Sequence, residues 1–196
     1  MKKVISSVSY SQDEILQSII DLYCPDGFDC DPTYSKGNFY KNIKAPKYKF
    51  DIKPQTPDTV QATSCNLPFE KDQLNSIVFD PPFCFGIHGQ VKNNIMSKRF
   101  TVYQDYKELY DHYFLSAKEF YRVLRKGGYL IWKCQDYTDS VTTMTHCLVY
   151  TIAEEMGFYA QDLFILVANA RIFNPNLVQR HARKFHSYFW VFKKKK

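Results

Sequence analysis

Apolar residues at the three- to four-residue spacing of an amphipathic helix first recur over residues 10–23. Ser11 precedes Glu14 by the spacing of a capping box, which marks a helix start. The apolar stripe of this predicted helix is Ile15, Ile19 and Leu22. The helix is expected to end before Cys24-Pro25-Asp26-Gly27, because proline and glycine interrupt helical backbone there.

Two further helices are predicted in the second half of the chain. One covers residues 103–128 and ends at Gly127 and Gly128. Its apolar face would be Tyr110, Tyr113, Ala117, Phe120, Tyr121 and Leu124. The other covers residues 140–156 and ends at Gly157. Its inward side chains would be Met144, Cys147, Leu148, Ile152 and Met156.

Short apolar runs between these helices predict strands. They lie at residues 28–30, 47–51, 74–80 and 129–134, with a last pair at 162–168 and 185–192. Strands that alternate with helices predict an α/β fold, a doubly wound, mostly parallel sheet covered on both faces. Only a loop joins the last two strands, so we expect an antiparallel C-terminal pair.

Three of the predicted strands run into an aspartate: Asp31, Asp51 and Asp80. In open parallel sheets, ligands bind just beyond the carboxyl ends of the strands. All three carboxylates are therefore expected at the ligand-binding edge of the sheet.

The segment Asp80-Pro81-Pro82-Phe83 combines a carboxylate, a stiff backbone and an aromatic ring. The two prolines fix φ and remove two N–H donors, which leaves backbone carbonyls to accept hydrogen bonds. A carboxylate and a carbonyl held together can accept both hydrogens of an amino group, and Phe83 can stack on a flat ring. The cluster suits an exocyclic amine of a nucleobase. Taken by themselves, the four residues are better explained by a strand that ends at Pro-Pro with a core phenylalanine; the acids at the other strand ends favour the binding site.

Composition narrows the function classes only slightly. The 196 residues suit one domain, and 17% of them are aromatic, which is enough for a core and for a stacking site. The net charge is +6, but it falls to +2 without the terminal lysines 193–196, a basic tail that we expect to be solvated. The charge is therefore weak evidence for a nucleic-acid partner.

The chain shows no sign of export, membrane insertion or a metal site. No apolar run approaches the ~20 residues of a membrane helix, and the first residues lack the apolar core of a signal peptide. The six cysteines form no close CxxC pair, so no metal is expected. Free thiols in the cytoplasm are the prediction.

The order of these motifs resembles the S-adenosylmethionine-dependent amino-methyltransferases, which modify adenine N6 or cytosine N4 in DNA, in particular small phage or prophage members. Asp80-Pro81-Pro82-Phe83 resembles their catalytic signature, and "DCDPTYSKGNFYKN" resembles their cofactor loop. The likeness covers roughly residues 10–192 and implies the class I methyltransferase fold as a single domain over residues 1–196.

The resemblance also implies S-adenosyl-L-methionine as cofactor. Asp31, with Pro32 and Thr33, would contact its methionine part, and Asp51, followed by Ile52, its ribose. The segment "NLPF" at residues 66–69 would lie beside the adenine, which places Ser64 and Leu67 in the pocket. Family members usually carry two or more glycines in the cofactor loop and an acid before "NLPF"; here the loop has only Gly37, and residues 63–65 are Thr-Ser-Cys.

The predicted reaction is methylation of N6 of an adenine flipped out of DNA. Hydrogen bonds to Asp80 and to the Pro81 carbonyl would draw the amine toward tetrahedral geometry while Phe83 holds the ring. Adenine is favoured because cytosine N4 enzymes of this family more often have Ser at the first motif position. Two alternatives remain open: an RNA methyltransferase acting on guanine N2 or adenine N6, and a degenerate module that binds nucleic acid without catalysis. A protein-glutamine substrate is less favoured, since that group more often has Asn at the first position.

Contacts to DNA are expected from basic residues in loops. The candidates are Lys98, Arg99, Arg171, Arg180, His181, Arg183 and Lys184. His88, Gln135 and Asp136 could border the target base. Residues 84–102 and 171–184 are the only segments expected to have room for sequence recognition. Either recognition is short and relaxed, or a second copy or a separate specificity partner supplies the rest.

Overall fold

An eight-stranded sheet forms the centre of the computed structural model, which describes residues 4–86, 103–138, 141–168 and 180–195. The strand order is β1-β9-β10-β6-β5-β2-β3-β4. The strands are β1 (Val8–Ser9), β2 (Cys30–Asp31), β3 (Tyr48–Asp51), β4 (Val60–Gln61), β5 (Leu74–Phe79), β6 (Leu124–Cys134), β9 (Phe158–Val167) and β10 (His186–Lys194). A separate hairpin pairs β7 (Tyr137–Thr138) with β8 (Thr142–Thr143).

Neighbouring strands are parallel except where β10 is involved. β10 pairs antiparallel with both β6 and β9, while β1 pairs parallel with β9, and β5 with β2 and β6. The mostly parallel sheet and the antiparallel pair of β9 and β10 were both predicted from the sequence, and both are confirmed.

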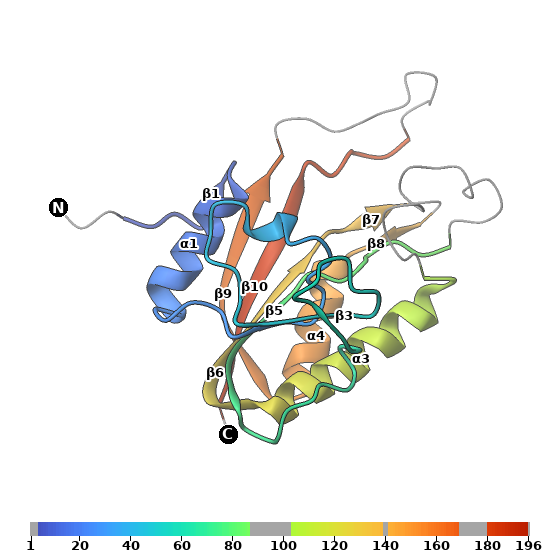
Figure 1. Cartoon of the computed structure of the whole chain (residues 1–196). Helices are drawn as coiled ribbons and strands as arrows, with labels where there is room; N and C mark the ends of the chain where they lie inside the picture. The colour runs from blue at the N-terminus through green and yellow to red at the C-terminus, as the bar shows by residue number, and fades with distance from the viewer. Residues whose placement is uncertain (1–3, 87–102, 139–140, 169–179, 196) are drawn as a thin grey trace.

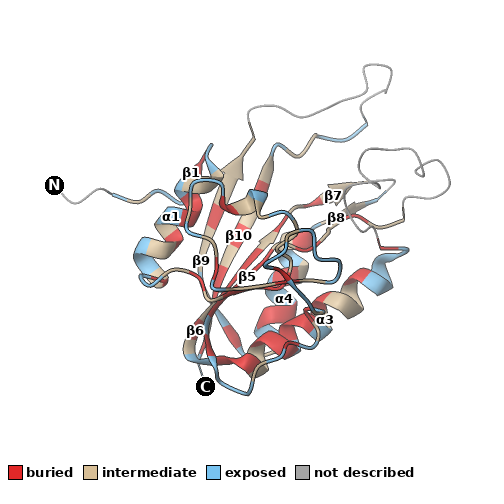
Figure 2. Cartoon of the chain, in the orientation of Figure 1, coloured by how far each residue is buried: buried red, intermediate tan, exposed pale blue. Residues whose placement is uncertain are grey.

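Helices cover both faces of the sheet (Figure 1). They are α1 (Gln12–Tyr23) on one face, α3 (Tyr106–Val123) and α4 (Thr145–Glu155) on the other, and a short 3-10 helix η1 (Asn38–Tyr40). Side chains alternate along the strands, so Val78 and Ile131 pack toward α1 while Phe79 and Trp132 pack toward α3 and α4. Figure 2 shows the buried residues on the sheet and on the inward sides of the helices.

The ends and faces of the first two helices differ in detail from the prediction. In α1, Leu22 is 47% exposed, and Leu16 takes the place in the core that was expected for it. α3 ends at Val123, where the chain turns directly into β6, so Gly127 and Gly128 lie inside a strand. Leu124 ends the helix because its ψ of 134° is extended, not because a glycine follows.

The predicted inward face of the last helix is correct in part: Ile152 is buried, and Leu148 and Met156 are partly buried against the core. Met144 and Cys147 are exposed, whereas Thr145, Val149 and Ala153 are buried with Ile152. The helix also begins five residues later than predicted, since residues 142–143 belong to β8. Helical spacing alone could not find the correct face, because apolar residues lie on several sides of this segment.

Other differences concern strands and the C-terminal lysines. β2 begins two residues later than predicted, and the short strands β1 and β4 were not predicted. Lys193 and Lys194 belong to β10 rather than to a solvated tail. Lys194 is only 3% exposed, and its ammonium donates to Asp72 at 2.6 Å and to the carbonyls of Tyr121 and Leu124 at 2.6 and 2.7 Å. All three acceptors lie far from Lys194 in the sequence, so local spacing could not predict these hydrogen bonds.

All six cysteines are unpaired, as predicted. In the described part of the chain, no helix is both long and apolar enough to cross a membrane.

Candidate active site

The three predicted strand-end aspartates lie at one edge of the sheet. Asp31 ends β2, Asp51 ends β3, and Asp80 directly follows β5. β2 pairs parallel with both β3 and β5, so the carboxyl ends of the three strands meet at that edge.

Asp31 is a buried carboxylate to which no described residue brings a positive charge. It is 1% exposed; Oδ1 accepts from the backbone N–H and hydroxyl of Thr33 at 2.7 and 2.9 Å, and Oδ2 from the Tyr40 hydroxyl at 2.7 Å. Burial raises the pKa of Asp31 to about 7, although hydrogen bonds from Tyr40 and Thr33 oppose this; the nearby Asp80 adds to the rise. Among the described residues, no Lys, Arg or His forms an ion pair with Asp31.

Thr33 joins the predicted cofactor motif to the predicted catalytic motif. Its hydroxyl donates to Asp31 and accepts from the backbone N–H of Asp80 at 3.0 Å. Pro32 between them is buried. The two motifs, far apart in sequence, are therefore held in register by one hydroxyl group.

Asp51 links the end of β3 to the cofactor-type loop, the segment of residues 29–42 that resembles a cofactor loop. Its two carboxylate oxygens accept from the backbone N–H groups of Ser35 at 2.9 Å and Lys53 at 2.7 Å. Each oxygen has a second lone pair, so the carboxylate can still accept from a ligand hydroxyl. Ile52 is 61% exposed beside it, available for apolar contact.

Gly37 is required by the shape of this loop. Its φ is +70°, in the left-handed region, and it precedes η1. A methyl group added to its Cα would lie 2.5 Å from the Tyr34 hydroxyl. This single glycine therefore permits both the left-handed backbone and the close approach of Tyr34.

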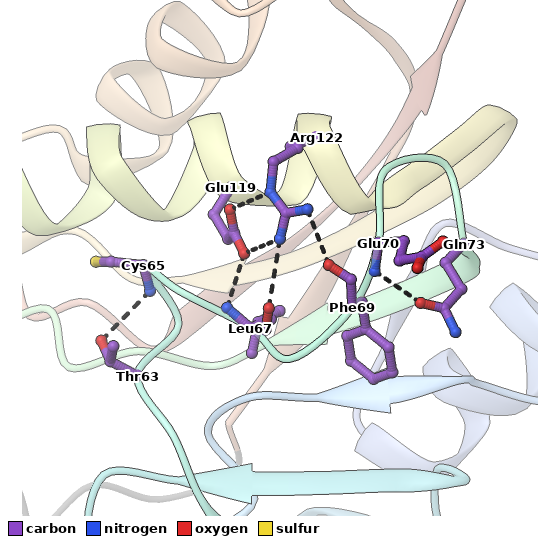
Figure 3. A network of polar contacts seen from close by, with 8 residues as sticks. All are labelled: Thr63, Cys65, Leu67, Phe69, Glu70, Gln73, Glu119 and Arg122. Atoms are coloured by element: carbon purple, nitrogen blue, oxygen red, sulfur yellow. Dashed lines mark hydrogen bonds and ion pairs between the residues drawn. The ribbon is translucent and has the colours of Figure 1, made fainter.

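The loop after β4, Thr63–Phe69, is fixed to α3 and is called here the anchored loop. Glu119 accepts from the Leu67 N–H at 2.7 Å and from Arg122, which also donates to the Leu67 and Phe69 carbonyls at 3.3 and 2.8 Å (Figure 3). The Ser64 hydroxyl lies 2.8 Å from both His112 Nε2 and Ser116 Oγ. Ser64 and Leu67 are 4% and 3% exposed, so the structure places both against α3 and the core.

The Asp-Pro-Pro-Phe segment combines fixed backbone with free ligand-binding groups. Pro81 is buried, and the Pro82 carbonyl accepts from the Tyr113 hydroxyl at 2.7 Å. Phe83 is half-buried, and its ring has no aromatic partner among the described residues. The side chain of Asp80 is 34% exposed.

Lys133 is a site residue that the sequence reasoning missed. It lies next to the last residue of β6, and its Nζ is 3.4 Å from Oδ2 of Asp80. A signal was present: a charged residue follows the apolar run Leu130-Ile131-Trp132 at the end of a central strand. Such a residue at a strand end is unusual unless it is paired.

Of the expected nucleic-acid contacts, only part falls on described residues. Arg180 is exposed, and Arg183 and Lys184 are partly exposed, in the segment before β10. The start of β10 meets the carboxyl ends of β9 and β6, since His186 pairs with Val167 and Tyr188 with Cys134. This basic segment therefore lies at the edge formed by the carboxyl ends of the strands, the same edge as the aspartates. His88, Lys98, Arg99 and Arg171 lie outside the described residues.

Asp136 serves the structure of α4. It is 4% exposed, and its Oδ1 accepts from the backbone N–H of His146 at 3.3 Å and lies 2.7 Å from His146 Nδ1. Met144, the residue before the helix, has no side-chain acceptor to cap it, so Asp136 supplies one from outside the helix. A direct role at a target base is not needed to explain this residue.

The residues at this edge fit a cofactor that carries positive charge. A buried carboxylate without a cation is costly unless a cationic ligand completes it, and Asp31 is such a group. Oδ2 of Asp31 accepts only one hydrogen bond from the described residues, so it keeps a lone pair that an ammonium donor could use. The left-handed Gly37 lets the backbone come close to a ligand at the same edge.

The chain matches no protein-family model and no curated protein. Several solved structures have a similar fold. A SAM-dependent methyltransferase from Thermotoga maritima, a candidate histamine N-methyltransferase, is 16% identical over 92% of this chain and 87% of its own, with a TM-score of 0.53. A chain of the complex between the Haloferax volcanii Trm112 methyltransferase activator and a candidate methyltransferase is 12% identical over 86% and 82%, also with a TM-score of 0.53.

A candidate DNA modification methylase from Thermus thermophilus is 17% identical over 66% of this chain, with a TM-score of 0.46. The present chain spans about half of that protein, 48% of its length. At these identities a shared fold does not decide a substrate. The fold that the comparisons and the strand order establish is that of the class I S-adenosylmethionine-dependent methyltransferases.

Proposed function

We propose that this protein transfers a methyl group from S-adenosyl-L-methionine to the exocyclic N6 of an adenine in DNA. The observation that carries the proposal is the link made by Thr33 between Asp31 and Asp80. It brings a buried acid suited to a cationic cofactor next to an acid suited to an amine, at the ligand-binding edge of a methyltransferase fold.

The cofactor would be held by the loop between β2 and η1 and by the end of β3. Asp31, Pro32, Thr33 and Gly37 would face its methionine part, and Asp51 its ribose, with Ile52 beside it. S-adenosyl-L-methionine supplies an electrophilic methyl group on a sulfonium sulfur. The anchored loop would border its adenine mainly through shape, since the Ser64 hydroxyl already has partners on α3.

The chemistry proposed for Asp80-Pro81-Pro82-Phe83 is activation of a weak nucleophile. The lone pair of an adenine amine is delocalised into the ring, so the free amine attacks poorly. Asp80 and the Pro81 carbonyl would each accept a hydrogen bond from one N–H of the amine. These bonds would draw the nitrogen toward tetrahedral geometry and offset the positive charge that develops on it. Tyr113 holds the Pro82 carbonyl, which fixes this stretch of backbone. The unpartnered Phe83 ring would stack on the base.

An adenine inside a duplex cannot reach this segment, so it would have to be flipped out at a cost of a few kcal/mol. Arg180, Arg183 and Lys184 lie in the segment before β10, and we propose that they contact phosphates beside the flipped base, together with Lys98 and Arg99. Their number is small, so a second copy or a specificity partner would add to recognition.

The test is methyl incorporation from isotopically labelled cofactor into genomic DNA, tRNA and protein, with the product identified by mass spectrometry. We expect N6-methyladenine in DNA. Asp80→Ala should lower incorporation by about 100- to 1,000-fold, the usual effect of removing a group that stabilises a transition state. Asp111→Ala, at an exposed helix position, is the matched control and should retain activity.

Other outcomes would point to the competing functions. Methylated guanine N2 or adenine N6 in tRNA, without DNA product, would replace DNA by RNA as the substrate. A wild-type protein that gives no binding heat with S-adenosyl-L-methionine would indicate a module that only binds nucleic acid. Unchanged activity of Asp80→Ala would remove the mechanism.

A further inference from the structure

Among the residues that the structure describes, the cation beside the proposed catalytic carboxylate is Lys133, on the neighbouring strand β6. Its Nζ lies 3.4 Å from Oδ2 of Asp80, and its side chain is 20% exposed. Among the described residues, Oδ1 of Asp80 has no hydrogen-bond partner. The two oxygens of this carboxylate are therefore unequal: one faces β6 and the other is left for a ligand.

The ammonium of Lys133 has a second set of partners, two aromatic rings. The ammonium nitrogen lies 4.9 Å from the ring centre of Phe39 in η1 and 5.6 Å from the ring centre of Phe189 on β10. Phe189 pairs with Lys133 across β10 and β6, so the sheet register sets this contact. Cation–π attraction holds the ammonium over these rings without help from Asp80.

This arrangement gives Lys133 a fixed position from which it can orient a carboxylate. The backbone of Asp80 is already fixed by its N–H bond to Thr33 and by the prolines that follow. The remaining freedom is rotation of the side chain, and the ammonium limits that rotation through Oδ2. At 3.4 Å the contact is longer than the 2.7–2.9 Å typical of a strong charge-assisted bond. Orientation, not tight binding, is therefore what Lys133 supplies.

We propose that Lys133 is a positioning residue for the methyl-transfer reaction: it holds Asp80 through Oδ2 so that Oδ1 faces the substrate amine. This inference rests on the proposed function, since it concerns the same carboxylate. A misplacement of about 1 Å in a catalytic group can cost about 100-fold in rate. Loss of the ammonium should thus slow the chemical step and leave substrate binding nearly intact.

The kinetic test compares Lys133→Met, which keeps the length of the side chain without its charge, with Lys133→Arg, which keeps the charge. Lys133→Met should lower kcat by about 10- to 100-fold with the KM for nucleic acid within about threefold of wild type. Lys133→Arg should restore most of that loss. Lys107→Met removes a lysine that pairs with Asp111 on the exposed side of α3, and should behave as wild type.

Equal kcat values for Lys133→Met and Lys107→Met would overturn the proposal. So would a rise in KM alone, which would make Lys133 a phosphate contact instead. A crystal structure of Lys133→Met gives an answer that needs no activity. We expect the Asp80 carboxylate to turn or to occupy more than one rotamer, and an unchanged orientation would refute the positioning role. If the wild type methylates no nucleic acid, the proposed function fails, and the crystal structure still decides the role of Lys133.

Discussion

Two buried acids, Glu119 in α3 and Asp31 at the end of β2, have pKa values that their surroundings shift in opposite directions. Glu119 is 8% exposed and makes a two-pronged contact with Arg122, with Nε–Oε2 and Nη2–Oε1 distances of 2.8 and 2.6 Å. Burial alone would raise the pKa of Glu119, but the bonds from Arg122 and the Leu67 N–H outweigh it and lower the pKa. Asp31 is more deeply buried and has no cationic partner in the described part of the chain, and its pKa is raised to about 7.

The contrast separates a structural carboxylate from one that is available to a ligand. Glu119 satisfies its charge within the chain and fixes the anchored loop, so its removal should damage the fold. Asp31 is held in place by hydroxyl and N–H donors that do not neutralise it, so its charge destabilises the ligand-free protein. A site that must bind a cation gains from keeping such a group.

The largest expected effect tests Asp31 through pH. The unfolded carboxyl titrates near 3.8 and the folded one near 7, so between these pH values the folded state binds more protons and stability falls as pH rises. A shift of this size corresponds to on the order of 4 kcal/mol. We expect Asp31→Asn to lack this loss and to exceed the wild type in stability at pH 8. Urea unfolding at pH 4.5, 6 and 8 measures the difference.

The control for that experiment is Asp111→Asn, an exposed change that should follow the wild-type pH curve. Parallel curves for wild type and Asp31→Asn would show that Asp31 has a neutralising partner after all. The comparison with Glu119 would then lose its meaning.

Glu119→Ala should have the opposite sign and the next largest effect. The change leaves the Leu67 N–H and the Arg122 guanidinium without their acceptor, which should cost about 2–3 kcal/mol of unfolding free energy. The partial exposure of Arg122 keeps the loss below that of a fully buried pair. Chemical denaturation measures it. Glu155→Ala, at an exposed position of α4, should change stability by less than about 0.5 kcal/mol.

Lys194 is a buried cation whose charge, like that of Glu119, is satisfied within the chain. Its buried ammonium donates to Asp72 and to two backbone carbonyls, so Lys194→Met should cost about 2 kcal/mol. The neighbouring Lys195 is exposed, and Lys195→Met should have almost no effect. Equal melting temperatures for the two variants would contradict the buried position of Lys194.

The smallest expected change in stability, with a functional consequence, comes from Gly37→Ala. A residue with a side chain at φ +70° costs about 1 kcal/mol, and the added methyl group also meets the Tyr34 hydroxyl. Gly127→Ala, with φ +79° and no neighbour within 4 Å, carries the backbone cost alone. We expect Gly37→Ala to lose more stability than Gly127→Ala because of this added contact, and only Gly37→Ala to weaken cofactor binding in calorimetry, by about 10-fold. Equal cofactor affinity would place the ligand away from this loop.

The sequence predicted the positions of the strand-end acids better than it predicted the helix faces. Asp31, Asp51 and Asp80 were each recognised because an apolar run stops at an acid, a local pattern, and they do lie at one edge of the sheet. The inward face of α4 was predicted only in part because helical spacing offers several faces when apolar residues surround the helix. Only contact with the sheet chooses among them.

Partners far apart in sequence were out of reach for the same reason. The acceptors of Lys133 and Lys194 lie 53 and 122 residues away. The position of Lys133 after an apolar run marks it as unusual but does not identify Asp80 as its partner, and nothing in local spacing distinguishes Lys194 from the exposed Lys195.

The alternation of strands with helices, the acids at strand ends and the rigid Asp80-Pro81-Pro82-Phe83 segment were determined by the sequence itself, because side-chain periodicity and proline geometry act over a few residues. Which acids are neutralised was decided only by the tertiary structure. Arg122 pairs with Glu119 within one helix turn, and Lys133 on β6 pairs with Asp80 at the end of the neighbouring strand β5. No described cation pairs with Asp31. Charge pairing and burial depend on how distant segments pack, and that packing is a property of the whole fold.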